Sequence, residues 1–302
     1  MTASASLAAR PLEGVRRTPA RDRAHLPATA VRLARRNLIG ALGVLVVVLL
    51  VLVALFADRL SPFEPNAQVG TRLTPPSAQY VLGLDQLGRD VLSRIIYGTR
   101  VALEVSLASV GVAVVVGGGL GVLSGYYGGL LDNALMRVMD VLFTLPSFVL
   151  ALAVTGILGP SLPNVVLAVA LVTIPTLARV ARAPVLVVRE AEFVTSARAV
   201  GARDGRIMLL HVLPNVLAPV IVQTTVSIAD AILIEAGLSF LGLGVQPPDA
   251  SWGNMLGTGR TFMELANGLS VFPGAAIMLA VLGFNFAGDG LRDVLDPRLR
   301  GV

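Results

Sequence analysis

The sequence predicts an all-α polytopic membrane protein with six transmembrane helices and with both termini in the cytoplasm. Hydrophobic residues make up 55% of the chain and charged residues only 14%. The mean hydropathy is +0.78, and these values lie outside the usual balance for a soluble domain. Six apolar runs, each long enough to cross a bilayer, alternate with segments that hold most of the charge.

The first apolar run holds nineteen uncharged residues, 38–56, and predicts a first transmembrane helix over residues 38–57. The run is too long for the apolar region of a signal peptide and no A-x-A cleavage site follows it, so we expect it to be retained. The other runs predict a five-helix core within residues 101–290, with helices over residues 101–125, 141–158, 164–181, 216–237 and 271–288.

The polar segments set the topology. Residues 1–37 are rich in Ala, Arg and Pro, which is typical of a disordered cytoplasmic tail. Residues 58–100 contain four prolines and predict an extracytoplasmic loop that ends in an amphipathic helix. Residues 126–140, 183–215 and 291–302 then lie in the cytoplasm. With Arg179 and Arg182 at the inner end of the fourth span, the inside holds 18 arginines and the outside 6. This distribution satisfies the positive-inside rule and predicts a multi-pass protein of the cell membrane.

Composition also excludes several kinds of site. All 24 Lys-plus-Arg positions are arginine, so the chain lacks the lysine of a Walker A loop and that of a Schiff base. There is no cysteine, and neither H-E-x-x-H nor G-x-S-x-G spacing occurs. We therefore expect no catalytic, cofactor or metal site, and no nucleic-acid binding, because the arginines follow the topology. The single tryptophan, Trp252, is expected to anchor at the membrane interface.

The polar segment 183–215 is the place where the chain is expected to meet a partner. Its pattern predicts two short helices joined at Gly201, which supplies a left-handed stop, with Asp204 capping the second helix and Pro214 closing it. The alternative is an amphipathic hairpin held on the anionic inner leaflet by its arginines. The apolar positions at helical spacing are Phe193, Ala197 and Val200 in the first helix, and Ile207, Leu210 and Leu213 in the second.

Four glycines recur at four-residue spacing in and after the second span: Gly117, Gly121, Gly125 and Gly129. Such spacing places small residues on one helix face and lets another helix approach closely in lipid. We expect them to pack against another span of this chain or of a paired subunit.

Two carboxylates, Asp230 and Glu235, lie deep in the fifth predicted span. Ionisable groups inside a membrane are candidates for a translocation path, and otherwise have a paired or hydrogen-bonded packing role. An intramembrane enzyme that used both as an acid–base pair is a rival hypothesis. Their five-residue spacing turns them about 140° apart on a helix, so the two groups are not expected to converge.

Within the polar segment, the residues Thr195-Ser196-Ala197, Gly201 and His211-Val212-Leu213-Pro214 resemble the EAA loop of ATP-binding-cassette importer permeases. The glycine, the second alanine, the leucine and the proline match that pattern. Thr195, Ser196 and His211 depart from it, and Glu192, one turn earlier, is the candidate for the acidic contact.

The resemblance extends over residues 37–298. The blocks that carry it are LGLDQLGRDVLSRIIYGTRVAL, LSGYYGG with MRVMDVLFTLP, LSFLGLGVQPPDASWGNML and GDGLRDVLDPR. They are similar to the C-type permease of dipeptide, oligopeptide and nickel importers.

The resemblance implies the fold of a type I importer permease and a role as half of a pore. It implies a heterodimer with a B-type permease, two ATPase subunits that bind the ATP and Mg, and an extracytoplasmic solute-binding protein. Peptide is the expected cargo, and nickel or another small solute is the alternative. The residues expected to contact the ATPases are Glu192, Phe193, Ala197, Arg198, Val200, Gly201, Arg203 and Asp204.

Overall fold

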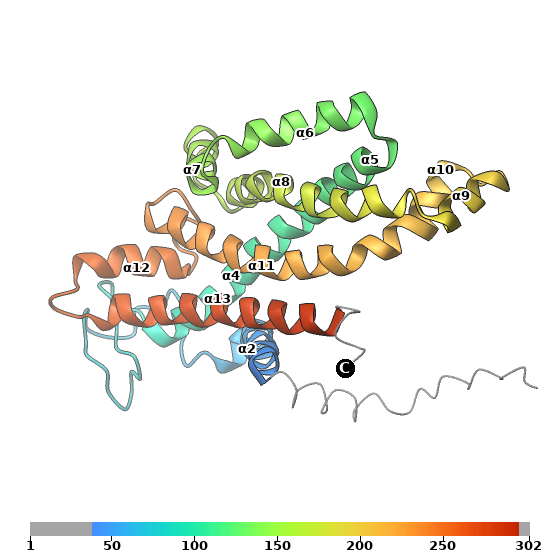
Figure 1. Ribbon diagram of the computed structural model, residues 1–302. Helices are drawn as coiled ribbons and strands as arrows, with labels where there is room; N and C mark the ends of the chain where they lie inside the picture. Colours follow the sequence, from blue (N-terminus) through green and yellow to red (C-terminus); the bar gives the residue numbers. More distant parts are fainter. Residues whose placement is uncertain (1–37, 296–302) are drawn as a thin grey trace, which may run out of the picture. The chain divides into compact units, whose positions relative to one another are not determined.

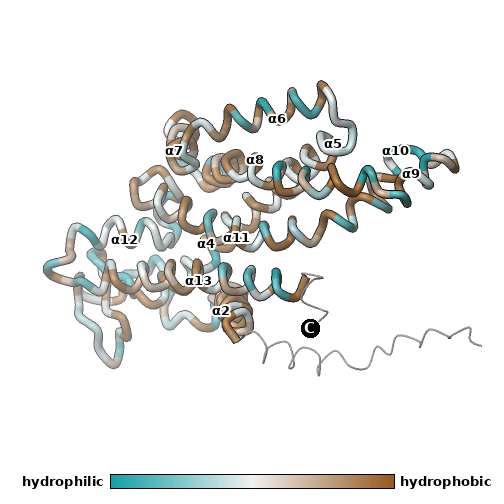
Figure 2. The backbone as a smooth tube through the Cα atoms, viewed as in Figure 1, coloured by the Kyte–Doolittle hydropathy of each residue, from teal (hydrophilic) through white to brown (hydrophobic). Residues whose placement is uncertain are grey.

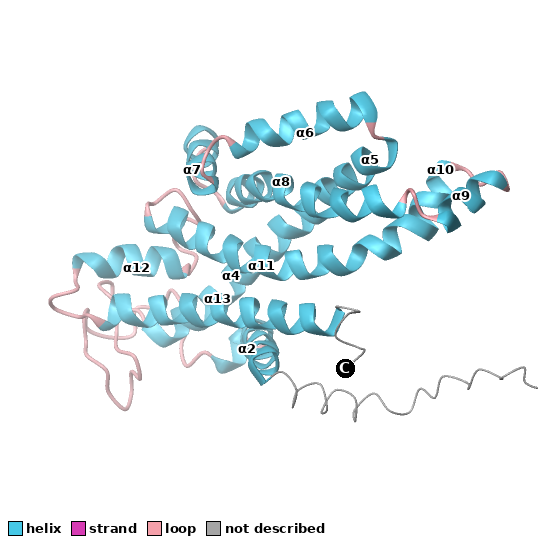
Figure 3. Cartoon of the chain, in the orientation of Figure 1, coloured by secondary structure: helices cyan, strands magenta, loops and turns pink. Residues whose placement is uncertain are grey.

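The computed structural model describes residues 38–295, and within them the chain is built of helices and connecting loops (Figure 3). The predicted tail over residues 1–37 and the last part of the segment 291–302 lie outside the described residues. Figure 1 labels most of the elements, which in chain order are α2 (Leu38–Leu55), α3 (Ala57–Leu60), α4 (Val91–Ala113), the π-helical turn η2 (Val114–Gly118), α5 (Gly119–Tyr127), α6 (Gly129–Phe143), α7 (Ser147–Leu158), α8 (Leu162–Val188), α9 (Glu192–Ala199), α10 (Asp204–Ile207), the π-helical turn η3 (Met208–Val212), α11 (Leu213–Phe240), α12 (Trp252–Thr261) and α13 (Gly268–Leu295).

Five helices of the described chain are long and apolar enough to cross a membrane, or six if the bent pair α6–α7 is counted as one span. Two of them are composite: α4, η2 and α5 form one helix of 37 residues, and α10, η3 and α11 form another of 37. Hydrophobic residues line the long helices, whereas hydrophilic residues gather in the loops near α12 and around α9 and α10 (Figure 2).

The third apolar run, 141–158, is not a single straight helix as its hydropathy suggests. Helix α6 continues to Phe143, and α7 starts after Pro146 at an angle of 85° to it. Proline disfavours a helical conformation in the residue before it, so the helix stops there. The 12 residues of α7 cover only about 18 Å, less than the roughly 30 Å of a hydrocarbon core.

The amphipathic helix expected at the end of residues 58–100 is not a separate element. Asp90 caps α4 by accepting hydrogen bonds from the Ser93 backbone N–H, at 2.7 Å, and from its hydroxyl, at 2.6 Å. From Val91 the helix runs unbroken past residue 100 into the second span. The predicted boundary between the outer loop and the core therefore lies inside α4.

Helix α8 is the central element, in contact with α4, α5, α7 and α11. One hydrophobic cluster joins it to α4, α11 and α13, and includes Val105, Val169 and Ile232. A second cluster lies toward the ends of α8 and α5 and includes Leu177, Val185 and Val216. Helix α2 packs on α13.

Three of the four spaced glycines lie against α8 of the same chain. At Gly117, an added Cβ atom would be 2.5 Å from the carbonyl oxygen of Ile174. At Gly121, it would press on the carbonyl oxygen of Ala178, and at Gly125, it would be 2.9 Å from the Cβ of Val185. Gly129 does not share this face. Helix α5 ends at Tyr127, the chain reverses through Gly128 and Gly129 at positive φ, and no atom lies within 4 Å of a Cβ at Gly129.

Candidate functional site: a helix end, a membrane cavity and an outer pocket

The short helix α9 is held at the tip of the bundle by its buried face. Val194 is fully buried and Ala197 packs against the second hydrophobic cluster, which includes Ile207 and Val212. Figure 1 shows α9 and α10 beyond the ends of α5 and α8. The packed face fixes α9 on this chain and leaves its other side free.

Gly201 ends α9 in the left-handed conformation, with φ of 81°. The Gly201 N–H donates to the Arg198 carbonyl at 2.9 Å, and the Ala202 N–H donates to the Ala197 carbonyl at 3.0 Å. These two bonds form a Schellman motif, which satisfies the last carbonyls of the helix. The turn aims the chain back into α10.

The exposed side of α9 and its turn carries apolar side chains, and charged side chains surround them. Val200 is 84% exposed, Phe193 47% and Leu209 65%, and seven of the 18 residues from 189 to 206 are charged. Glu192, Arg198, Arg203 and Asp204 are exposed as well. So many charges do not suit the hydrocarbon core, and exposed apolar side chains rimmed by polar residues mark a contact site for a protein or a membrane surface.

The second half of the segment differs from the sequence pattern. Ile207 is buried, but Leu210 is exposed and Leu213 only partly buried, and the buried positions that follow Ile207 are Val212, Val216 and Val220. The single π-helical turn η3 adds one extra residue to the helix, and the buried face therefore shifts by about one position after it. Pro214 does not close the helix, which continues through it along α11.

Asp204 does not cap α10, which begins after Arg203 without a side-chain cap. Its carboxylate instead accepts a hydrogen bond of 2.7 Å from the Tyr126 hydroxyl at the end of α5. The Arg198 guanidinium lies 5.3 Å from the centre of the Tyr126 ring, and the neighbouring Tyr126 hydroxyl raises the pKa of Arg198. Tyr126 therefore contacts both α9 and α10.

Other arginines tie the same end of the bundle together. Arg189 donates to the Gly125 carbonyl at 2.7 Å, and Arg182 donates two hydrogen bonds of 2.6 Å to Asp132 of α6. Bidentate pairs of this kind fix orientation as well as distance. Sequence reasoning missed these contacts, because their partners lie 50 or more residues apart.

A cavity of about 340 Å³ opens between α7, α8 and α11. Asp230 is exposed in this chain and is the single charged residue in the lining. The other lining residues are Ser147, Phe148, Val172, Thr173, Thr176, Ser227, Leu233 and Ile234.

Glu235 lies elsewhere, and the structure corrects its candidacy for the translocation path. Its side chain is 1% exposed and accepts hydrogen bonds from the hydroxyls of Ser239, at 2.7 Å, and Ser251, at 2.9 Å. It holds the loop after α11, and it does not line the cavity of Asp230. The two carboxylates therefore do not form the pair that an intramembrane enzyme would need.

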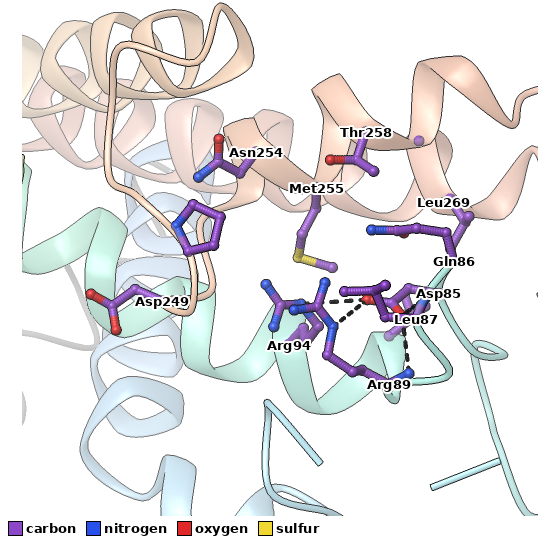
Figure 4. Close-up of a pocket in the computed structure, with 13 residues that line it drawn as sticks. Asp85, Gln86, Leu87, Arg89, Arg94, Asp249, Asn254, Met255, Thr258 and Leu269 are labelled. Atoms are coloured by element: carbon purple, nitrogen blue, oxygen red, sulfur yellow. Dashed lines mark hydrogen bonds and ion pairs between the residues drawn. The ribbon is translucent and has the colours of Figure 1, made fainter. Parts of the chain in front are cut away.

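The outer end of the chain contains a pocket of about 160 Å³ whose lining includes Asp85, Arg89 and Arg94 (Figure 4). Asp85 accepts from Arg89 Nε at 2.7 Å, and the buried Arg94 lies 3.9 Å from the same carboxylate. Arg94 also donates to the Pro65 carbonyl at 3.0 Å. These contacts tie the outer loop to α4, and the block LGLDQLGRDVLSR is the sequence signal that could have indicated them.

Trp252 is not an exposed interface anchor. It is 2% exposed, starts α12, and donates from Nε1 to the Ile95 carbonyl at 3.0 Å. Its indole lies against Gly98, where a Cβ atom would be 2.6 Å from the ring. Among residues 38–295, no group of three or more His, Cys, Asp or Glu side chains is placed to hold a metal ion.

Comparison with known proteins adds to this geometry. Residues 117–301 match the family described as binding-protein-dependent transport system inner membrane component. The chain is 43% identical to a dipeptide transport system permease of Alkalihalophilus pseudofirmus, over 88% of each chain. It is 46% identical to a di/tripeptide transport system permease of Pseudomonas aeruginosa, over 87% of this chain and 89% of the relative. It is also 44% identical to a glutathione transport system permease of Pectobacterium atrosepticum, over 89% and 90%.

Among solved structures, the chain is similar to an inward-facing methionine ABC transporter. The TM-score is 0.55 at 17% identity, and the match covers 68% of this chain and 97% of the other. At this identity the likeness shows a shared fold.

Proposed function

Because the chain belongs to the family of binding-protein-dependent transport system inner membrane components, we propose that it forms half of the pore of an ATP-driven peptide importer. Peptide is the proposed cargo because the chain is 43% and 46% identical to permeases for dipeptides and di/tripeptides, over 88% and 87% of its length. The chain also has the five to six membrane-crossing helices that such a role requires.

In this proposal the chain is a passive subunit and ATP is hydrolysed by partners. The pore is completed by a second, B-type permease, cargo is delivered by an extracytoplasmic solute-binding protein, and two ATPase subunits bind ATP and Mg. The absence of lysine, which a Walker A loop requires, supports this division of labour.

The surface proposed to contact an ATPase is the exposed side of α9 and its turn. Phe193 and Val200 supply apolar side chains, and Glu192, Arg198, Arg203 and Asp204 supply a charged rim. Gly201 sets the direction of this surface, and Ala197 holds it on the bundle. An anchor surrounded by polar residues is the usual anatomy of a protein interface.

Coupling then requires that the ATPases contact this surface differently in their two nucleotide states. Tyr126 supports a route for the resulting movement, because its hydroxyl joins Asp204 to the end of the 37-residue helix α4–η2–α5. A displacement of α9 and α10 would be carried along that helix toward the outer pocket, where α4 begins.

The test is uptake by the complete transporter in proteoliposomes. Labelled dipeptide and labelled nickel are supplied with the binding protein, with ATP or with a non-hydrolysable analogue. We expect ATP-dependent accumulation of the dipeptide alone. Accumulation of nickel without dipeptide would overturn the cargo, and dipeptide uptake that does not need ATP hydrolysis would overturn the mechanism.

A further inference from the structure

The carboxylate of Asp230 lies in a membrane-crossing helix, and no other part of the described chain covers it. It is exposed on α11, and within the described residues it forms no hydrogen bond or ion pair. A charged side chain facing lipid is costly, so this side of α11 must face water or another protein. The cavity beside it opens between three helices and has room for water or a small ligand.

The chemistry of the cavity favours a cation. Asp230 is its one charged lining residue, and the lining adds the hydroxyls of Ser147, Thr176 and Ser227. Ser227 lies on the cavity wall, and its hydroxyl forms no hydrogen bond within residues 38–295. Ser227 precedes Asp230 by three residues, which puts both on one helix face about 5–6 Å apart at Cβ.

A primary ammonium group fits this arrangement better than other common cations. It has three N–H donors and no acceptor, and it is satisfied by one carboxylate together with nearby hydroxyl oxygens. The hydroxyl of Thr173, which also lines the cavity, donates to the Val169 carbonyl at 2.7 Å. The other lining residues are apolar: Phe148, Val172, Leu233 and Ile234. Such a wall tolerates side chains of different shapes, because it offers contact without fixed hydrogen bonds.

We propose that Asp230 and Ser227 form a transient site for the primary ammonium group of a peptide as it passes through the pore, an inference that rests on the proposed function. The site would stabilise the charged amino terminus away from bulk water. It would leave the remainder of the peptide against the apolar wall.

The first experiment measures uptake of labelled dialanine by the complete transporter in proteoliposomes. We expect Asp230→Asn to lower the initial rate about tenfold or more, as the loss of a charge-assisted hydrogen bond predicts, and Asp230→Glu to retain most of it. Glu264→Gln is the control, because Glu264 is an exposed carboxylate in the loop between α12 and α13 and does not line the cavity. It should transport at the wild-type rate.

A second measurement separates a peptide site from an ion pair with the partner permease. The chain has no cysteine, so Ser147→Cys places a single thiol in this chain at the cavity wall, and its labelling is read from the mass of the intact chain. In the assembled transporter we expect a cationic thiol reagent to react faster than an anionic one. Adding Asp230→Asn should abolish this preference.

The outcomes are distinct. If the wild-type transporter shows no ATP-dependent dialanine uptake, the proposed function fails. If the wild type transports but Asp230→Asn is equally active, the ammonium site is overturned and the function stands. If Asp230→Asn is impaired but the thiol at position 147 shows no charge preference, Asp230 is neutralised by a cation of another subunit, which also overturns the site.

Discussion

The Tyr126 hydroxyl donates a 2.7 Å hydrogen bond to the carboxylate of Asp204, a residue 78 positions later in the chain. The bond joins the end of α5 to the start of α10, and the Arg198 guanidinium covers the same ring. The proposed ATPase-contacting surface is thereby fastened to the second span as well as to its own two helices. A displacement of α9 would therefore be transmitted to the helix α4–η2–α5, which is long enough to cross the membrane.

Tyr126→Phe tests this link. The change keeps the ring packed and removes the hydrogen bond, so it should cost about 1 kcal/mol of stability and lower dipeptide uptake per ATP hydrolysed. Uptake and phosphate release are measured on the same proteoliposomes. Tyr127→Phe is the control, because Tyr127 is its exposed neighbour and its hydroxyl has no bond within the described chain. Equal coupling ratios in the two variants would contradict the link.

The membrane character of the chain and the two short helices joined at Gly201 could be predicted from the sequence because both depend on local patterns. Hydropathy locates the spans, arginine counts orient them, and the glycine at position 201 marks a helix stop that the structure shows at positive φ. The same patterns do not report which face of a helix is covered. Val194, which was not among the expected apolar positions, is fully buried, whereas Phe193 and Val200 are exposed.

The features that sequence reasoning missed depend on long-range contacts or on changes of helical period. The acidic side chain of Glu235 suggests a residue of the translocation path. Its carboxylate instead accepts hydrogen bonds from two serines, one of which is 16 residues away. The turn η3 shifts the apolar face after Ile207, and nothing in a 3.6-residue period indicates such a shift. The bend before Pro146 could have been expected from the proline alone.

Gly201→Val should uncouple transport while the chain still inserts. Valine at φ of 81° is strained by about 1–2 kcal/mol or more, so the Schellman turn is lost and α9 changes its direction. Dipeptide uptake is measured together with the amount of chain in the membrane. The control is Gly205→Ala, since Gly205 has no positive φ and a Cβ there meets no atom within 4 Å. Wild-type uptake by Gly201→Val would contradict the role of this turn.

The double variant Phe193→Asp and Val200→Asp should release the ATPases. A charge buried in an interface without a partner costs several kcal/mol, so co-purification of the ATPases with the tagged chain should fall at least about tenfold. Leu265→Asp serves as the control, because Leu265 is 78% exposed in the loop between α12 and α13, away from α9 (Figure 1). Full retention of the ATPases by the double variant would favour a hairpin that lies on the membrane surface.

Gly121→Ala should separate α5 from α8. A Cβ at this position presses on the backbone carbonyl of Ala178, and relief of such overpacking costs roughly 1–3 kcal/mol. Gly119→Ala, two residues earlier, meets no atom within 4 Å and should be neutral or stabilising by up to about 1 kcal/mol. Thermal unfolding of the two variants in detergent checks this difference. If both unfold at the same temperature, the glycines do not limit the approach of the helices.

Glu235→Gln and Glu235→Ala together show whether the charge at this position is used in transport. One carboxylate oxygen of Glu235 accepts from both Ser239 and Ser251, and the Ser239 hydroxyl in turn accepts from the Val245 N–H at 3.1 Å. The amide oxygen of glutamine can replace that acceptor, so Glu235→Gln should keep the loop in place and transport at nearly the wild-type rate. Alanine leaves two buried hydroxyls without their acceptor, each at a cost of about 1–3 kcal/mol, and should lower the unfolding temperature of the complex.

Because Asp230→Asn is expected to impair transport without this loss of stability, the two carboxylates can be told apart by one pair of assays. A Glu235→Gln variant that is stable but inactive would return Glu235 to the translocation path.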